Sequence, residues 1–140
     1  MAGAKKVHHA TVLVTDLQKA EAFYSGVLGL PRIPRPELPS EGIWYELEGV
    51  QLHLIWTEEA EAATARHVAF VVDDLDSVLA RVREMGLQIW DDVQIDGFVR
   101  RHCRDPFGNG IELLQLVENG SASPASNKSC VGENGKWQIG

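Results

Sequence analysis

Two segments of this 140-residue chain repeat one another, and this internal repeat constrains the fold more than any other feature of the sequence. The segment 9–17, HATVLVTDL, matches the segment 67–75, HVAFVVDDL, which begins 58 positions later. Each copy reads as a histidine, a run of mostly apolar residues, and a polar residue followed by Asp-Leu. The match predicts two copies of one supersecondary unit rather than two unrelated halves.

Each copy continues into a segment with the spacing of an amphipathic helix. Apolar residues recur at intervals of three and four over residues 17–28 and again over residues 75–85. Asp16 and Asp74 precede these segments, where a carboxylate can accept hydrogen bonds from the amides of the first helical turn. A glycine, which can adopt the left-handed conformation, follows each helix: Gly29 and Gly86.

Segments rich in β-branched and aromatic residues follow each helix. We expect strands over residues 43–48, 50–56, 89–93, 98–103 and 110–116. Each half then reads βαβββ, which is too small to be stable alone but plausible as one of a pair. The sequence therefore predicts an α+β fold in one domain, residues 6–117, made of repeats 6–56 and 65–117. The segment 118–140 is small, polar and without period, and we expect a flexible C-terminal tail.

Charge and hydropathy exclude two classes of partner. The net charge is −7, which repels a nucleic-acid backbone, and one short basic cluster, residues 100–104, does not offset it. No apolar run approaches the roughly 18 residues of a membrane span, and no segment after Met1 resembles a signal peptide. We expect a cytoplasmic protein that binds neither nucleic acid nor membrane. Its two cysteines, Cys103 and Cys130, should be reduced.

The histidines fall on predicted strands, where alternate residues share a face. His9 and Thr11 lie on the face opposite Ala10 and Val12, and the apolar face is the one a helix should cover. The same parity places His67 on the uncovered face of the second copy. Both repeat-equivalent histidines should therefore point toward whatever the sheet encloses.

The last strand of each copy adds one more polar residue. Aligning QLHLI with GIELL places His53 and Glu112 at equivalent positions. If the strands curl so that their open faces meet, His9, His53, His67 and Glu112 converge. Three imidazoles and a carboxylate suit Fe(II), Ni(II), Zn(II), Co(II) or Mn(II). The alternative is four unrelated polar residues with structural partners, and the repeat symmetry favours the metal site.

With these residues, the chain resembles the vicinal oxygen chelate superfamily, which includes glyoxalase I, methylmalonyl-CoA epimerase, extradiol dioxygenases, fosfomycin-thiol transferases and bleomycin-resistance proteins. The resemblance rests on VTDLQKAEAFYSGVLGL after His9, QLHLIW around His53, VVDDLD after His67 and DPFGNGIELLQL around Glu112. It implies a curled mixed sheet around a cavity, with the helices outside. It also implies the same four metal ligands, although His53 stands where several members have Glu or Gln.

The resemblance extends to the residues around the metal. His102 stands where some members carry a tyrosine close to the metal. We therefore assign Glu112 and His102 as the catalytic residues. For His102, a histidine on the protein surface is an equally weighted alternative. Arg100 and Arg104 should share the face of His102. The predicted substrate-binding residues are Thr11, Trp44, Tyr45 and Arg100, with one of the two aromatic residues pointing into the cavity.

We therefore expect a metal-dependent enzyme acting on a small oxygen-chelating molecule, of lyase, isomerase or small dioxygenase type. The alternative is a non-catalytic binding protein resembling bleomycin-resistance proteins. The fosfomycin-thiol transferases need basic and serine residues where Asp92 and Asp96 stand here, which argues against their activity. Because an uncovered apolar sheet face would be costly, we also expect a homodimer.

Overall fold

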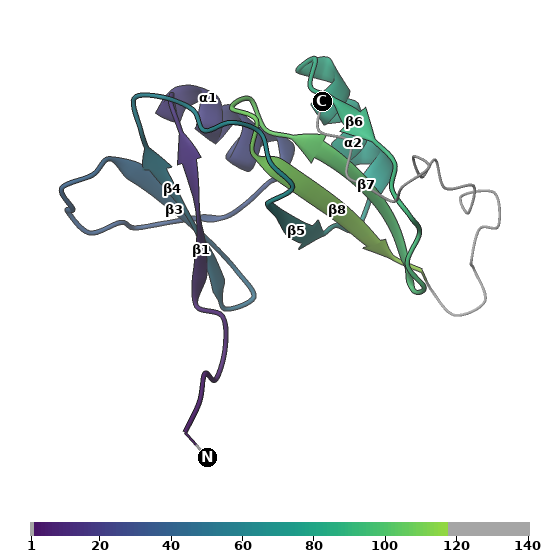
Figure 1. Ribbon diagram of the computed structural model, residues 1–140, viewed down its shortest axis with the longest axis horizontal. Helices are drawn as coiled ribbons and strands as arrows, with labels where there is room; N and C mark the ends of the chain where they lie inside the picture. The colour runs from purple at the N-terminus through teal and green to yellow at the C-terminus, as the bar shows by residue number, and fades with distance from the viewer. Residues whose placement is uncertain (1, 118–140) are drawn as a thin grey trace. The chain divides into compact units, whose positions relative to one another are not determined.

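The computed structural model describes residues 2–117, and the predicted tail 118–140 lies outside the described residues (Figure 1). The chain divides into two compact units, Met1–Glu61 and Ala62–Gly140. Each unit contains one copy of the sequence repeat. Among the described residues, no helix is both long and apolar enough to cross a membrane.

The first unit is built on a four-stranded mixed sheet in the order β1-β4-β3-β2. Its strands are β1 (His9–Val14), β2 (Arg32–Ile33), β3 (Gly42–Leu47) and β4 (Val50–Trp56). β1 runs parallel to β4, and the other pairs are antiparallel. The β3–β4 hairpin turns at Glu48 and Gly49, whose positive φ angles of 49° and 80° match the twist of the flanking strands.

The helical segment of this unit changes character along its length. It begins as α1 (Leu17–Glu21), with the Asp16 side chain accepting a hydrogen bond from the Lys19 amide at 3.0 Å, as predicted. It continues as a π-helix, η1 (Ala22–Val27), rather than as the uniform α-helix expected from the spacing. Within η1, the consecutive residues Phe23 and Tyr24 are both fully buried. The π turn, which contains more residues than an α-helical turn, coincides with the burial of these two adjacent aromatic side chains.

The second unit repeats this arrangement, with a sheet in the order β5-β8-β7-β6. Its elements are β5 (His67–Val71), α2 (Leu75–Glu84), β6 (Ile89–Trp90), β7 (Phe98–Arg104) and β8 (Gly110–Leu116). Figure 1 shows β7 and β8 as the longest antiparallel pair of this unit. The Asp74 side chain caps α2 by accepting from the Ser77 amide, and Gly86 follows the helix at a φ of 71°.

The burial pattern confirms the predicted faces of the strands. Val14 in β1 and Phe70 in β5 are buried, whereas His9 and His67 are exposed on the other face. The buried face of α2 consists of Leu75, Val78, Leu79 and Val82. Two βαβββ repeats with mixed sheets confirm the α+β class, and in the described residues each sheet is open at both edges.

Candidate functional site

In the first unit, His53 lies between two other aromatic rings. The His9 ring stacks on His53 with centroids 4.1 Å apart and planes inclined by 17°. The Trp44 ring stacks on His53 at 4.0 Å and 3°. The contact with Trp44 follows from the register, because Trp44 of β3 is a strand partner of His53. The other strand partner of His53 is Thr11 of β1, and His9 lies two residues before Thr11 on the same face of the sheet.

Hydrogen bonding and burial define the protonation of His53. Its Nε2 donates to the Gln51 side-chain oxygen at 2.8 Å, which leaves Nδ1 as the nitrogen with the lone pair. Burial lowers the pKa of His53 below its usual value, and the nearby His9, His8 and Arg35 lower it further. His53 is therefore a neutral imidazole at neutral pH, the form in which histidine binds metals.

In the second unit, Glu112 is buried and ion-paired. Arg100 Nη1 donates to Glu112 Oε1 at 2.6 Å, and both side chains are about nine-tenths buried. Arg100 also donates from Nε to the Val93 carbonyl at 2.6 Å, and its Nη2 lies 3.6 Å from Asp92 Oδ2. The guanidinium supplies the positive charge that a carboxylate on this apolar strand requires.

His102 lies beside the same carboxylate. It is the strand partner of Glu112, and its Nε2 is 3.4 Å from Glu112 Oε1 and 3.4 Å from Asp92 Oδ2. Burial lowers the pKa of His102 to about 4, because it outweighs the opposite effect of the Glu112 and Asp92 carboxylates. The surface alternative for His102 is wrong, since only 1% of the residue is exposed.

His67 has the hydrogen bond that is typical of a metal-binding histidine. Its Nδ1 lies 2.8 Å from the Ala65 carbonyl oxygen, which can only accept, so Nδ1 carries the proton and Nε2 the lone pair. Gly110 is the strand partner of His67. A Cβ at Gly110 would lie 2.6 Å from the Arg66 carbonyl oxygen, so only glycine allows β8 to approach the start of β5 this closely.

The two units place these residues at matching positions. Three pairs share the same register position: Thr11 and Ala69, Trp44 and His102, His53 and Glu112. In each unit the histidine that starts the sequence repeat lies two residues before the strand partner of His53 or Glu112. The pairing derived from sequence alignment is therefore also a pairing in the sheet register.

Trp44 and Tyr45 lie on opposite faces of β3, in keeping with the expectation that only one of them points into the cavity. Trp44 lies on the face of His53, and the exposed Thr11 shares this face. Tyr45 lies on the helix-covered face, fully buried, with its hydroxyl 3.0 Å from Ser25 Oγ. We therefore correct the predicted substrate-binding set by removing Tyr45, because adjacent residues of a strand point to opposite faces.

Four residues that the sequence did not assign to the site lie around these groups: Gln51, Trp90, Asp92 and Arg104. Trp90 stacks on His102 with centroids 5.7 Å apart, and Arg104 lies over the Trp90 ring at 5.2 Å. The alternation of side chains along β7 could have placed Arg104 in the site, because it puts Arg104 on the same face as Arg100 and His102. Trp90 belongs to a two-residue strand, β6, whose pairing the sequence did not reveal.

The donor set matches a divalent transition metal in its chemistry. His9 and His53 belong to the first unit, and His67 and Glu112 to the second. Imidazole nitrogens and one carboxylate are ligands for Fe, Ni, Zn, Co and Mn, and the proton of His67 on Nδ1 suits ligation through Nε2. Within residues 2–117, no three His, Cys, Asp or Glu side chains form a metal-ready group.

The sequence profile of the Glyoxalase/Bleomycin resistance protein/Dioxygenase superfamily matches residues 6–113. This match covers the first repeat, the second repeat as far as residue 113, and all four candidate ligands. Among curated proteins, the uncharacterized protein YaeR of Escherichia coli (strain K12) is 26% identical over 129 residues, which cover 82% of this chain and 99% of YaeR.

Solved structures share the fold. A protein from Bacillus anthracis assigned to the glyoxalase family is 26% identical, with a TM-score of 0.71 over 83% of this chain and 98% of that one. A mutant of the fosfomycin resistance protein FosX from Listeria monocytogenes, solved with Mn(II) and 1S,2S-dihydroxypropylphosphonic acid, is 18% identical. Its TM-score is 0.67 over 84% of this chain and 95% of FosX, a likeness of fold alone.

Proposed function

Because this chain belongs to the Glyoxalase/Bleomycin resistance protein/Dioxygenase superfamily, we propose that it is a metal-dependent enzyme acting on a small molecule that chelates through two oxygens. The proposed reaction is of glyoxalase-like lyase, isomerase or small dioxygenase type. The proposed ligands are His9, His53, His67 and Glu112, and the ion is Fe, Ni, Zn, Co or Mn.

One observation carries this proposal: the two units present their histidine and carboxylate donors at matching register positions. His53 and Glu112 occupy equivalent sites on β4 and β8, and His9 and His67 occupy equivalent sites on β1 and β5. Unrelated structural residues would not have to follow the repeat in this way. The FosX structure with Mn(II) supports the proposal at the level of the fold.

The side chains suggest a separate role for each residue of the proposed site. A bound divalent ion would supply positive charge to two neighbouring oxygens of the substrate. His102 is neutral at neutral pH, since burial lowers its pKa to about 4, and its Nε2 lies 3.4 Å from Glu112 Oε1. We assign proton transfer to these two residues. Trp44, Thr11 and Arg100 are the proposed substrate contacts.

Metal analysis tests the proposal directly. Protein purified without added ions should carry close to one transition ion per chain, and a Glu112→Gln variant should carry much less. Activity is then assayed with the adduct of methylglyoxal and glutathione and with catechols. Less than about a tenth of an ion per chain after incubation with Fe, Ni, Zn and Mn would refute the enzyme proposal, since such a site should compete with solvent for the metal.

One observation favours a second candidate, a non-catalytic protein that binds a small molecule. Glu112 already has a cationic partner in Arg100 at 2.6 Å, so its charge is compensated without a metal. In this case the protein would bind an aromatic or anionic molecule without turnover. The metal content defined above distinguishes the two candidates, because only the enzyme requires the ion.

A further inference from the structure

Two adjacent histidines, His8 and His9, are hydrogen-bonded to each other at the start of β1. Their Nδ1 atoms lie 2.9 Å apart, and the rings meet edge to face, with centroids 5.1 Å apart and planes inclined by 86°. A hydrogen bond between two imidazole nitrogens contains one proton, so one Nδ1 donates and the other accepts. The direction of this bond decides which ring nitrogen of His9 carries the lone pair.

Both histidines are exposed, but each is anchored to the sheet of the first unit. The carbonyl oxygen of His8 accepts from the Gln51 amide at 2.9 Å, which ties the residue before β1 to β4. The ring of His9 stacks on His53 with centroids 4.1 Å apart. Within residues 2–117, His8 is the one hydrogen-bond partner of the His9 ring.

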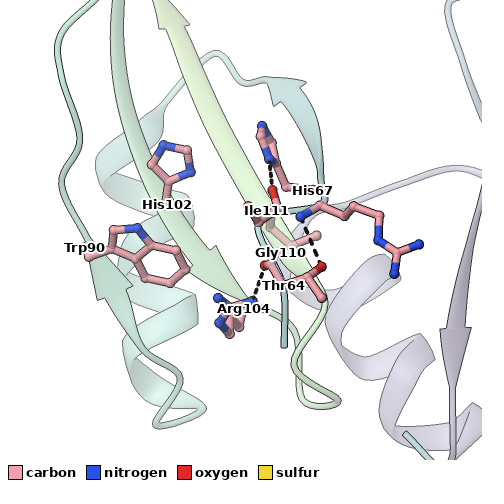
Figure 2. A pocket seen from close by; sticks show the side chains of 9 residues that line it. Thr64, His67, Trp90, His102, Arg104, Gly110 and Ile111 are labelled. Atoms are coloured by element: carbon pink, nitrogen blue, oxygen red, sulfur yellow. Dashed lines mark hydrogen bonds between the residues drawn. The ribbon is translucent and has the colours of Figure 1, made fainter. Parts of the chain in front are cut away.

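The repeat-equivalent histidine of the second unit indicates the direction of the bond. His67 Nδ1 donates to the Ala65 carbonyl oxygen at 2.8 Å, a hydrogen bond drawn as a dashed line in Figure 2. Because a carbonyl oxygen can only accept, the proton of His67 lies on Nδ1 and the lone pair on Nε2. In both units, therefore, Nδ1 of the repeat histidine is a hydrogen-bonded ring nitrogen. The same direction in the first unit makes His9 the donor and His8 the acceptor.

The acceptor differs between the two units. The residue before His67 is Arg66, whose side chain can only donate, and a main-chain carbonyl accepts instead. In the first unit the acceptor is the side chain of His8. A single substitution can therefore remove it without changing the main chain.

We propose that His8 is a positioning residue, which accepts the hydrogen bond from His9 Nδ1 and so leaves the lone pair of His9 on Nε2. Its role toward a metal rests on the proposed function, in which His9 is a ligand. An imidazole that ligates through one ring nitrogen commonly donates from the other, and this second bond fixes its tautomer and orientation. In the opposite direction, with His9 accepting, the proton would lie on Nε2 and that nitrogen would have no lone pair for a metal.

The first measurement locates the proton of His9 in the full-length, metal-free protein. Two-bond ¹H–¹⁵N spectra are recorded at about pH 8, above the range in which histidine ordinarily titrates, and the His9 ring is identified by its loss in His9→Asn. Ring nitrogens with and without a proton resonate far apart in these spectra. The wild type should show the proton of His9 on Nδ1, and an Nδ1 without a proton would overturn the proposal.

Two substitutions of His8 separate its acceptor from its ring. His8→Phe keeps an aromatic ring beside His9 but has no acceptor, so the proton of His9 should move toward Nε2. His8→Asn keeps an acceptor, the amide oxygen, and should leave the proton on Nδ1. Val7→Ala, at a neighbouring residue that is 66% exposed, should resemble the wild type. A proton that stays on Nδ1 in His8→Phe would overturn the proposal.

The second measurement is the affinity of the same proteins for Zn(II), determined by competition with a chromogenic chelator. His8→Phe should bind Zn(II) more weakly by about 10-fold or more, as is typical when a ligand loses its outer hydrogen-bond partner. His8→Asn and Val7→Ala should bind like the wild type. If His8 were itself a ligand, His8→Asn would lose affinity together with His8→Phe, and that result would overturn the positioning role. Equal affinity of His8→Phe and the wild type would overturn it too.

The two measurements distinguish failure of this proposal from failure of the proposed function. Absence of Zn(II) binding by the wild type would count against the proposed function, and the spectra of the metal-free protein would still decide whether His8 holds the proton of His9 on Nδ1. Tight Zn(II) binding by a wild type whose His9 Nδ1 has no proton would overturn the role of His8 and leave the metal proposal standing.

Discussion

Arg100 Nη1 and Glu112 Oε1 lie 2.6 Å apart, joining neighbouring strands β7 and β8 by a buried, charge-assisted hydrogen bond. Glu112 is at the same time the carboxylate that we propose as a metal ligand. The Arg100 guanidinium and a divalent ion would therefore stabilise the same negative charge. If so, adding the ion should offset part of the effect of removing the guanidinium.

Arg100→Gln should destabilise the metal-free protein by about 3–5 kcal/mol, because it leaves the Glu112 carboxylate buried without a cation. Under the metal proposal, Mn(II) should restore part of the loss by supplying positive charge to that carboxylate. Urea denaturation with and without Mn(II) measures both effects.

Arg101→Gln is the matched control for Arg100. Its partner Asp91 is partly exposed, so the loss should be about 0–1 kcal/mol and independent of metal. Equal stability of the two variants would contradict a structural role for the Arg100–Glu112 pair.

His53→Ala should weaken metal retention by about 10-fold or more, because the site loses one of its four proposed donors. The metal content after dialysis measures this, with Gln18→Ala as a control at an exposed position outside the proposed set. Retention equal to that of the control would reduce the site to His9, His67 and Glu112.

Cys103 should be nearly unreactive in the folded protein. Burial, helped by the Asp105 charge, raises the pKa of this fully buried thiol to about 12 from a usual value of 9.0. At about pH 8 its thiolate fraction is then roughly 1000-fold lower than that of an ordinary thiol, and it should rise about tenfold per pH unit. Thiol titration with a chromogenic disulfide measures this in a Cys130→Ser variant.

In this variant, the reaction should become fast in concentrated guanidinium chloride, where the thiol is exposed and its pKa is normal. Fast reaction of the native protein near neutral pH would contradict the burial of Cys103.

Two glycines of the first unit should respond to alanine in opposite ways. A Cβ at Gly42 would overlap the Leu54 carbonyl oxygen, so Gly42→Ala should destabilise by about 1–3 kcal/mol. Gly26 lies within η1, and no described residue outside its own helical turn has an atom within 4 Å of the added Cβ, so Gly26→Ala should stabilise by about 0.4–1 kcal/mol. Thermal denaturation of both variants tests this, and a loss at Gly26 as large as that at Gly42 would contradict it.

We also predict that the protein is a homodimer. Both sheets of the described residues have open edges, and each βαβββ unit is small for independent stability. Light scattering at micromolar concentration should give a mass of about 31 kDa, twice the 15.4 kDa of one chain. A mass near 15 kDa would refute the dimer.

Local signals in the sequence were enough to predict most of the fold. Asp16 and Asp74 cap their helices as expected, and both act through amides only three residues away. Strand β2 was not predicted, since Arg32 and Ile33 stand between prolines and become a strand only by pairing with β3. The π-helix η1 was also missed, because the burial of adjacent Phe23 and Tyr24 depends on the sheet beneath them.

The candidate site also combines features that the sequence predicts with features that depend on tertiary contacts. The sequence by itself determined the repeat, the strand faces, and the equivalence of His53 with Glu112, because each depends on spacing along one chain segment. Only the tertiary structure decided that Trp44 rather than Tyr45 stacks on His53, that Arg100 pairs with Glu112, and that Arg104 has no carboxylate partner among the described residues. These contacts depend on the register between strands and on rotamers set by packing, and neither is encoded in the periodicity of a single segment.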